Sequence, residues 1–138
     1  MLKLIVGVKG TGKTKTIIAL ANKAVEESKG SVVFVEKGTK LIHEVNYRAR
    51  LIDSEDFAVN SAEALYGFMA GIYASNHDVT HIFIDSALKI CNNDIEQFTE
   101  FVKRTAMLGE ANNINFIFTS SLPLEDVPEE LGKYILPL

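Results

Sequence analysis

The chain has 138 residues, 47% of them hydrophobic and 23% charged, which is the size and composition of one ordinary globular domain. Its formal net charge of −4 argues against a broad nucleic-acid surface, although a local basic patch is compatible with it. The one cysteine, Cys91, excludes an internal disulfide, and the apolar start MLKLIVGV is too short for a signal sequence or a membrane span. We therefore expect a single cytoplasmic, soluble domain over residues 1–138, with no membrane segment and no clear nucleic-acid surface.

The first part of the chain predicts a strand, a loop, a helix and a second strand. Leu2–Val6 is short and nearly all apolar, and Gly7 bounds it, as is typical of a strand buried on both faces. From Lys13 the apolar residues follow a period of 3.6, which predicts a helix that Gly30 ends. The stripe of that helix consists of Ile17, Leu20, Ala21, Ala24 and Val25. Residues 31–35 (SVVFV) then predict a strand that Glu36 closes.

The middle of the chain gives weaker patterns before its next helix. Residues 40–50 predict a helical turn, and residues 49–53 predict a short strand. Asn60 and Ser61 offer a helix cap, with Glu63 three residues after Asn60. The apolar residues that follow at helical spacing are Leu65, Phe68, Met69, Ile72 and Tyr73.

The last part of the chain predicts two more buried strands around a helix. Residues 81–84 (HIFI) predict a strand ending in Asp85, and residues 114–118 (INFIF) predict one that ends in Thr119, Ser120 and Ser121. Asn93 and Glu96 resemble a capping pair for the helix that lies between these two strands. Its stripe includes Ile95, Phe98 and Val102. In the tail, residues 128–133 predict a short helix and residues 134–136 a last strand.

Buried strands that alternate with amphipathic helices predict an α/β fold, a three-layer parallel sheet with helices on both faces. Chemistry in such sheets gathers at the carboxyl ends of the strands. The polar residues that close the strands are Glu36, Asp85, Thr119 and Ser120. We expect them on one edge beside residues 7–14, with Glu36 one or two strands away from that loop.

Residues 7–14 (GVKGTGKT) match the phosphate-binding motif G-x-x-x-x-G-K-[ST], between a predicted strand and a predicted helix. Glycines let backbone N–H groups turn toward phosphates, and the helix points its positive end at the same anion. Lys13 brings a charge to the β- and γ-phosphates, and the Thr14 hydroxyl is a ligand for Mg²⁺. The predicted nucleotide-binding residues of the loop are Gly7, Val8, Lys9, Gly10, Thr11, Gly12, Lys13 and Thr14.

Asp85 ends an apolar strand well after this loop, which matches the Walker B pattern. Its carboxylate is expected to hold Mg²⁺ through water. The alternative is an ordinary strand-end Asp in a turn or helix cap. With the loop present, we predict a Mg²⁺ site made by Thr14 and Asp85.

With both motifs in place, the chain resembles the P-loop NTPases, and its order of strands resembles a minimal RecA-like or KaiC-like ATPase core. That resemblance implies that Glu36 is the catalytic glutamate that polarises water, and that Thr119 or Ser120 senses the γ-phosphate. Asp85 is followed by Ser86 rather than by the Glu of AAA-type and transporter ATPases. The alternatives are a solvated Glu36 paired with Lys37 or Lys40, and capping or core roles for Thr119 and Ser120.

Other candidate residues give less direction. Arg48, Arg50 and Arg104 could each supply a finger to a neighbouring subunit, or lie on the surface. The three histidines show no metal-ligand spacing and Cys91 has no partner motif, so no metal other than Mg²⁺ is expected.

The predicted function is Mg²⁺-dependent ATP binding with slow or partner-stimulated hydrolysis, in which Lys13 and Glu36 are catalytic. The predicted partners are the nucleotide and a second copy or another protein. One alternative is a non-catalytic nucleotide-binding switch. A small-molecule or nucleotide kinase is disfavoured because three arginines give little material for a lid, and a GTPase because no N-K-x-D motif is present.

Overall fold

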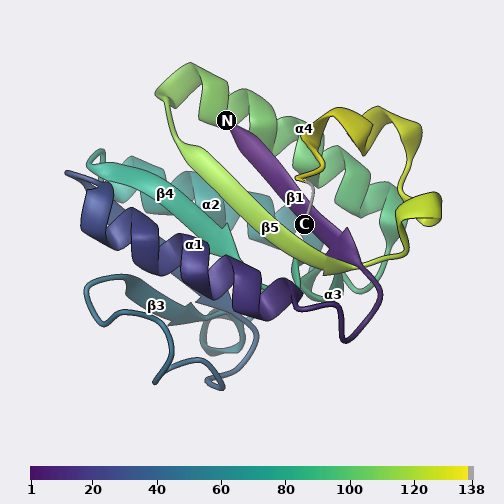
Figure 1. Ribbon diagram of the computed structural model, residues 1–138. Coiled ribbons are helices and arrows are strands. Elements are labelled where there is room, and N and C mark those ends of the chain that lie inside the picture. Colours follow the sequence, from purple (N-terminus) through teal and green to yellow (C-terminus); the bar gives the residue numbers. More distant parts are fainter. Residues whose placement is uncertain (137–138) are drawn as a thin grey trace.

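The computed structural model of the protein describes residues 1–136, and its centre is a five-stranded sheet with every neighbouring pair parallel (Figure 1). The order across the sheet is β1-β5-β4-β2-β3. The strands are β1 (Leu2–Gly7), β2 (Ser31–Glu36), β3 (Arg50–Asp53), β4 (Val79–Ile84) and β5 (Asn115–Ser121). The predicted parallel α/β sheet is therefore confirmed, with strand ends that differ from the prediction by one to three residues.

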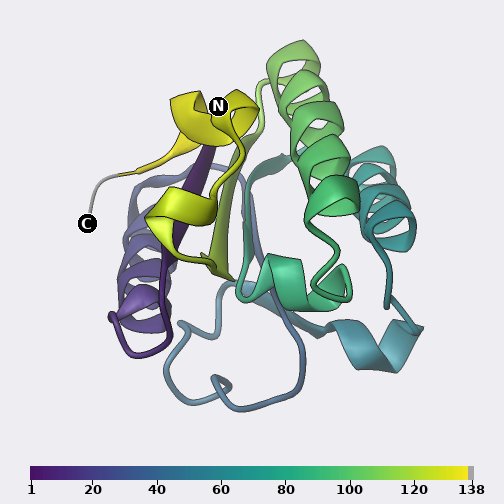
Figure 2. The same ribbon diagram turned by 90° about the vertical axis from the view of Figure 1, so that its right-hand side faces the viewer.

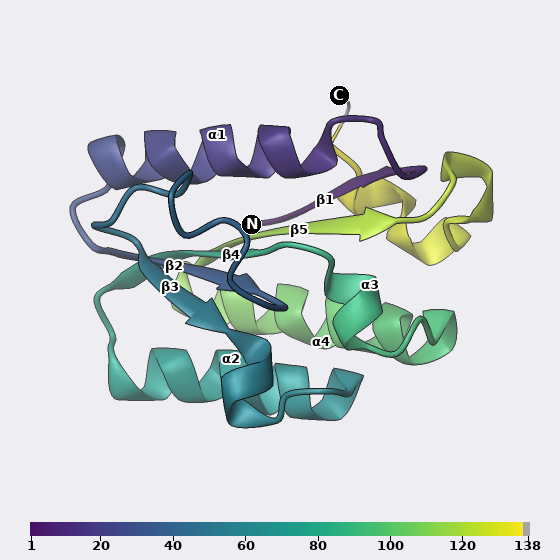
Figure 3. The ribbon, with the colours of Figure 1, turned by 90° about the horizontal axis from the view of Figure 1, so that it is seen from below.

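Helices cover both faces of this sheet, which gives three layers (Figures 2 and 3). Helix α1 (Lys13–Glu27) lies on one face, whereas α2 (Ala62–Ser75) and α4 (Ile95–Asn112) lie side by side on the other. Because successive strand residues point to opposite faces, Ile117 joins the α1-side core while Phe116 and Phe118 join the other. Burial on both faces explains why the strands are almost wholly apolar in sequence.

The carboxyl ends of all five strands point toward one edge because the strands are parallel. Figure 3 shows the arrowheads of β1 and β5, the loop into α1 and the short helix α3 (Ala87–Ile90) at the same end of the molecule. Two strands, β5 and β4, lie between β1 and the strand that carries Glu36. The expectation that Glu36 lies one or two strands from the loop is wrong, since β2 is the third strand away.

Side chains cap the starts of α2 and α4, and one of the two predicted caps is wrong. Ser61 caps α2 by accepting a hydrogen bond from the Ala64 N–H at 3.1 Å. Helix α4 is capped by Asp94, which accepts from the Gln97 N–H at 3.0 Å, and not by a pairing of Asn93 with Glu96. Asn93 adopts a left-handed conformation with φ of 57° and belongs to the preceding turn. The predicted stripe of α4 holds for Phe98 and Val102, but Ile95 at the first turn is 37% exposed.

Gly30 does not end α1 as the sequence suggests. The helix stops at Glu27, and the Ser28 N–H donates to the carbonyl of Ala24. A Cβ at Gly30 would collide with the carbonyl oxygen of Asp78. Glycine is required there because the residues just before β2 and just before β4 approach each other closely.

The remaining segments contain short helices and turns. Three 3₁₀ helices are η1 (Ser54–Phe57), η2 (Leu124–Asp126) and η3 (Glu129–Tyr134), of which η3 matches the predicted tail helix. The predicted helical turn within 40–50 is present as a single turn, in which the Val45 N–H donates to the Leu41 carbonyl at 3.1 Å, and the rest of that segment forms no helix. The predicted strand at 134–136 is reduced to one parallel bridge, Leu4 with Ile135, beside a hydrogen bond from the Leu136 N–H to the Leu4 carbonyl. No helix within residues 1–136 combines the length and apolar character needed to cross a bilayer.

Candidate functional site

A cleft of about 510 Å³ lies at the carboxyl edge of the sheet. It brings together predicted site residues that are far apart in the sequence: the loop before α1, Glu36 at the end of β2, Asp85 after β4 and Thr119 in β5. Its lining residues are Lys9, Gly10, Gly12, Lys13, Thr14, Lys15, Glu36, Lys40, Leu41, Asp85, Ser86, Lys89, Thr119 and Ser121. The parallel sheet therefore places most of the predicted side chains around one space.

The loop from Gly7 to Thr14 has a backbone that glycine makes accessible. Gly12 is the N-cap of α1 with φ of 83°, and Gly10 has φ of 89°, both in the region that other residues rarely adopt. Because Gly12 offers no side-chain cap, no side chain satisfies the first N–H groups of α1 from that position. The first turn of α1 lines the cleft through Lys13, Thr14 and Lys15. A helix start of this kind favours anions.

Lys13 is held inside the loop. Its side chain is 8% exposed, and its ammonium donates to the carbonyl of Val8 at 2.9 Å. Burial lowers the pKa of Lys13, and the nearby charge of Asp85 acts in the opposite direction. The loop thus positions a cation beside its own backbone.

Asp85 is the centre of a hydrogen-bonded group that joins the loop to β5. The Thr14 hydroxyl lies 3.3 and 3.4 Å from its two carboxylate oxygens, and the Thr119 hydroxyl donates to Oδ1 at 2.7 Å. The Thr119 oxygen also accepts from the Ser86 N–H at 2.7 Å. Ser86 itself has a left-handed backbone, φ 62°, as the chain turns into α3. Thr119 therefore orients Asp85, while Thr14 is only loosely bonded to it, since hydroxyl–oxygen hydrogen bonds are usually about 2.7–2.8 Å long.

Glu36 is buried, with 4% exposure, and its side chain connects the cleft to the β2–β3 connection. Oε1 accepts from the Lys40 N–H at 2.9 Å and Oε2 accepts from the Leu41 N–H at 3.2 Å. Burial raises the pKa of Glu36, and the hydrogen bonds from Leu41 and Lys40 partly oppose that effect. The alternative of a solvated Glu36 that pairs with a lysine side chain does not hold: its partners are backbone groups.

Ser120 does not line the cleft. Both residues are buried, but neighbouring strand residues face opposite sides, so Thr119 faces the cleft whereas Ser120 faces α3. The Ser120 hydroxyl donates to the Thr119 carbonyl at 2.8 Å and accepts from the Leu88 N–H at 3.3 Å. Of the two predicted γ-phosphate sensors, only Thr119 lines the cleft, and Ser121 lines it as well.

The cleft carries more positive than negative side chains. The residues predicted at the strand ends do not indicate this, because none of them is basic. Five lysines line it, against the carboxylates of Glu36 and Asp85. Three of these lysines belong to the loop and the first turn of α1, while Lys40 and Lys89 come from the β2–β3 connection and from α3. No local motif marks Lys40 or Lys89, because their position depends on the fold. A site with this charge and these N–H groups suits a polyanion such as a polyphosphate.

Magnesium fits the site only as an ion shared with a ligand. Among residues 1–136, no group of three or more His, Cys, Asp or Glu side chains is placed to hold a metal ion. Thr14 and Asp85 offer a hydroxyl and a carboxylate side by side, the oxygen ligands that Mg²⁺ prefers. Mg²⁺ usually keeps waters and takes few protein ligands together with substrate phosphates. The donor set is therefore compatible with a nucleotide-bound Mg²⁺ and unsuited to a structural metal.

None of the three arginines lines the cleft. Arg48 and Arg50 lie on the β2–β3 connection and the edge strand, and the Arg104 guanidinium lies 4.0 Å from the centroid of the Tyr66 ring. Any finger role for them would have to be exerted on another molecule.

Comparison with models of protein families gives no match, and no curated protein matches this chain at a significant level.

Proposed function

We propose that this protein binds ATP with Mg²⁺ as a P-loop NTPase of RecA-like type, and that it is a slow or partner-stimulated ATPase. The observation that carries the proposal is the meeting of two sequence motifs in space. The loop of residues 7–14 ends in Thr14, whose hydroxyl lies within 3.4 Å of both oxygens of Asp85. Two motifs separated by 71 residues thus form one cationic cleft.

The order of the strands supports the finer assignment to a RecA-like type. Asp85 follows β4, Thr119 lies in β5 on one side of it, and Glu36 ends β2 on the other. In this arrangement, Thr119 and Glu36 flank Asp85 at the same edge. That is the juxtaposition which a γ-phosphate sensor and a water-activating glutamate require.

The roles of the residues follow from their chemistry. Lys13 and the N–H groups at the start of α1 hold phosphate oxygens, and Thr14 with Asp85 holds the ion. Bound Mg²⁺ would supply neutralisation of the phosphate charge. Glu36 orients the attacking water and accepts its proton as the bond between the γ-phosphorus and the ADP oxygen breaks. Its raised pKa makes Glu36 a stronger base than an ordinary glutamate, and each carboxylate oxygen has a second lone pair for a water.

One observation favours the switch alternative. Both Glu36 oxygens already accept hydrogen bonds from the Lys40 and Leu41 backbone, so Glu36 has a structural role independent of catalysis. If Glu36 only couples the occupancy of the cleft to the conformation of the β2–β3 connection, the protein would bind nucleotide without turnover. The kinase alternative gains no support, because no arginine lines the cleft.

The experiment is phosphate release from Mg-ATP by purified protein, compared with Lys13→Ala and with Lys23→Ala, an exposed lysine farther along α1. We expect slow turnover that Lys13→Ala abolishes and Lys23→Ala leaves intact. Turnover that requires an added phosphoryl acceptor would identify a kinase. If the protein binds nucleotide but shows no turnover, either at low or at high protein concentration, the non-catalytic switch would be the favoured function.

A further inference from the structure

The connection between β2 and β3 carries a concentration of positive charge that the cleft uses only in part. Residues 37–50 contain Lys37, Lys40, Arg48 and Arg50 against a single carboxylate, Glu44, in a chain whose formal net charge is −4. Lys40 lines the cleft, but Arg48 and Arg50 do not. We call Ile42, Tyr47, Arg48 and Arg50 the Tyr47 surface.

Tyr47 is 92% exposed, although the segment around it is firmly attached to the protein. Leu41, Val45 and Ala49 are buried in the core on the α1 side of the sheet. Asn22 of α1 bonds the segment on both sides of Val45: its Nδ2 donates to the Glu44 carbonyl at 3.0 Å, and its Oδ1 accepts from the Asn46 N–H at 2.7 Å. The aromatic ring is therefore presented to solvent from an anchored turn.

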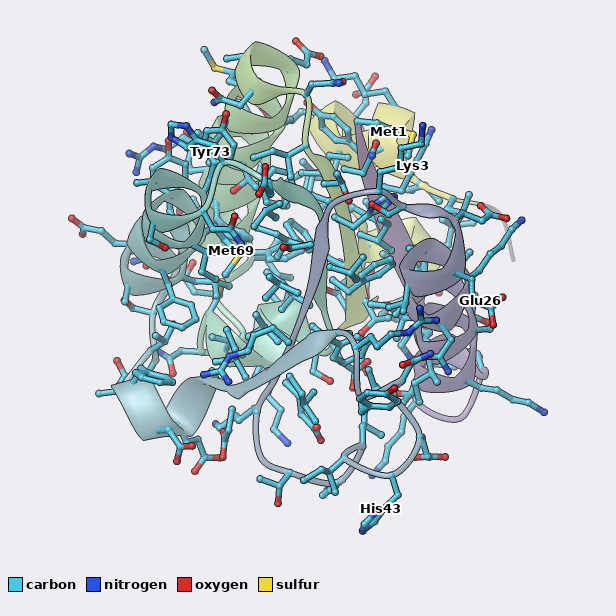
Figure 4. All side chains as sticks on the ribbon, turned by 90° about the vertical axis from the view of Figure 1, so that its left-hand side faces the viewer. Met1, Lys3, Glu26, His43, Met69 and Tyr73 are labelled. Carbon is cyan, nitrogen blue, oxygen red and sulfur yellow. The ribbon has the colours of Figure 1, made fainter. Side chains whose placement is uncertain are left out.

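The turn itself has a defined shape. The Ala49 N–H donates to the Asn46 carbonyl at 2.9 Å, and the Arg48 N–H donates to the Asn46 side chain at 2.9 Å. Figure 4 shows the segment projecting from the body of the protein, with His43 at its outer end pointing away from the sheet. An exposed tyrosine on such a fixed turn loses little entropy when a planar partner stacks on it.

Two hollows meet at the arginines. One of about 430 Å³ is lined by Ile42, Tyr47, Arg48 and Arg50, with Val45, Asn46, Ala49 and Leu51 completing it. A second of about 490 Å³, between the edge of the sheet and α2, is also lined by Arg48 and Arg50. Arg48 and Arg50 thus line both hollows. Such a path suits an extended ligand better than a single small anion.

Both guanidinium groups lack an acidic partner within the described chain. Among residues 1–136, the ion pairs are formed by Lys23 and Lys103, and none involves Arg48 or Arg50. Exposed arginines with free donors bind phosphates in forked pairs of hydrogen bonds. The surface therefore offers two phosphate contacts beside one aromatic platform and an aliphatic side chain.

We propose that the Tyr47 surface binds single-stranded nucleic acid. Phosphodiester groups contact Arg48 and Arg50, and an unpaired base stacks on Tyr47. A duplex hides the faces of its bases, so it would use only the arginines. An acidic peptide would likewise leave the tyrosine ring without a planar partner. The negative net charge of the whole chain does not oppose binding at this site. At ordinary salt concentration, screening shortens the range of electrostatic interactions between exposed charges to about 8–10 Å.

The test is fluorescence anisotropy of a labelled oligothymidylate of about 16 nucleotides, the upper end of the length that a small single-strand-binding fold covers. Nucleotide is left out, so that the result does not depend on the proposed ATPase function. We expect salt-sensitive binding that is tighter than for a duplex of the same length or for polyglutamate. Tyr47→Ala weakens it roughly 5- to 100-fold, whereas Tyr47→Phe retains it.

The charge contribution has its own measurement. Arg48→Ala with Arg50→Ala makes the slope of log affinity against log salt shallower by about 1.4, as two lost phosphate contacts require. Tyr47→Ala lowers affinity without changing that slope. The matched control, Lys23→Ala with Lys133→Ala, removes two exposed charges elsewhere and leaves the affinity within a factor of about two. All of these positions are exposed, and far-ultraviolet circular dichroism verifies that each variant folds.

Four results overturn the proposal: no binding at low salt, equal binding of duplex and single strand, tighter binding of polyglutamate, or binding that the Tyr47 and arginine variants leave unchanged. Lys13→Ala separates this surface from the cleft. Loss of oligonucleotide binding in Lys13→Ala, with the Tyr47 variants unaffected, would place the polyanion in the cleft instead.

Discussion

The Thr14 hydroxyl lies 3.3 and 3.4 Å from the two carboxylate oxygens of Asp85, although 71 residues separate them in the chain. The pair joins the first turn of α1 to the end of β4, across the intervening strand β5. Thr119 of that intervening strand fixes the carboxylate through a 2.7 Å hydrogen bond to Oδ1. Two side chains suited to one divalent ion are thus held together by three separate elements.

Asp85→Asn is expected to weaken the Mg²⁺ dependence of ATP binding by at least about ten-fold, similar to the loss of an outer-shell partner of a metal. Binding of ATP without Mg²⁺ should change much less, because Lys13 and the loop contact the phosphates directly. Calorimetric titration of ATP with and without Mg²⁺ measures both quantities. Asp78→Asn, at the opposite end of β4, is the control and should behave as wild type. Wild-type Mg²⁺ dependence in Asp85→Asn would reduce Asp85 to a residue that shapes the turn.

Glu36→Gln should retain Mg-ATP binding and lose turnover by roughly 10²- to 10⁴-fold, the contribution of a general base or water-orienting group. Single-turnover hydrolysis at saturating protein measures the rate, and binding is measured separately. Glu44→Gln changes an exposed glutamate of the same connection and serves as the matched control. Equal rates for Glu36→Gln and wild type would move the catalytic role elsewhere.

The pH dependence of the free energy of unfolding should also reflect the burial of Glu36. Because burial raises the pKa of this carboxyl above its ordinary 4.5, the folded protein retains the proton to higher pH than the unfolded chain. The free energy of unfolding of wild type relative to Glu36→Gln should therefore fall as pH rises through 4.5 and then level off above the folded pKa. Urea unfolding of both proteins across this range gives the difference, in which the carboxylates that do not interact with Glu36 cancel, while Asp85 and Asp53 are coupled to it. A difference that rises with pH would contradict a raised pKa.

Two glycine substitutions should change the free energy of unfolding in opposite directions. Gly30→Ala places a Cβ against the Asp78 carbonyl and the Thr80 side chain, and is expected to destabilise the fold by about 1–3 kcal/mol. Gly67→Ala lies within α2, where a Cβ meets nothing within 4 Å, and is expected to stabilise by about 0.5–1 kcal/mol. Urea unfolding measures both. A neutral Gly30→Ala would show that the contact between the residues just before β2 and just before β4 relaxes at little cost.

The sequence predicted the features that local patterns determine. The strands are continuous apolar runs and the loop is a contiguous motif, so the sheet, the positions of Lys13 and Thr14, and the strand-end Asp85 followed directly. The prediction that either Thr119 or Ser120 senses the γ-phosphate neglects the alternation of strand residues, which places the two on opposite faces. At α4, Asn93 is predicted as the cap, but its left-handed backbone places it in the preceding turn, and the adjacent Asp94 caps the helix instead.

Other features depend on contacts between distant segments. The backbone partners of Glu36 belong to a connection without a regular pattern, and Gly30 is needed because of Asp78 on another element. Lys40 and Lys89 reach the cleft from the β2–β3 connection and from α3, which was not predicted. The exposure of Tyr47 likewise follows from how Asn22 and the buried residues around it fix the turn.

Isothermal titration of Mg-ATP into wild type and Lys13→Ala tests the central claim, that the cleft binds a nucleoside triphosphate, most directly. Wild type should bind Mg-ATP, and it should bind Mg-GTP no more tightly, since no guanine motif is present. Removing the Lys13 ammonium should cost about 1.5–3 kcal/mol, or roughly 10- to 150-fold in Kd, as expected for hydrogen bonds to charged groups. Absence of binding by any nucleoside triphosphate at millimolar concentration, or equal affinity in wild type and Lys13→Ala, would contradict the account.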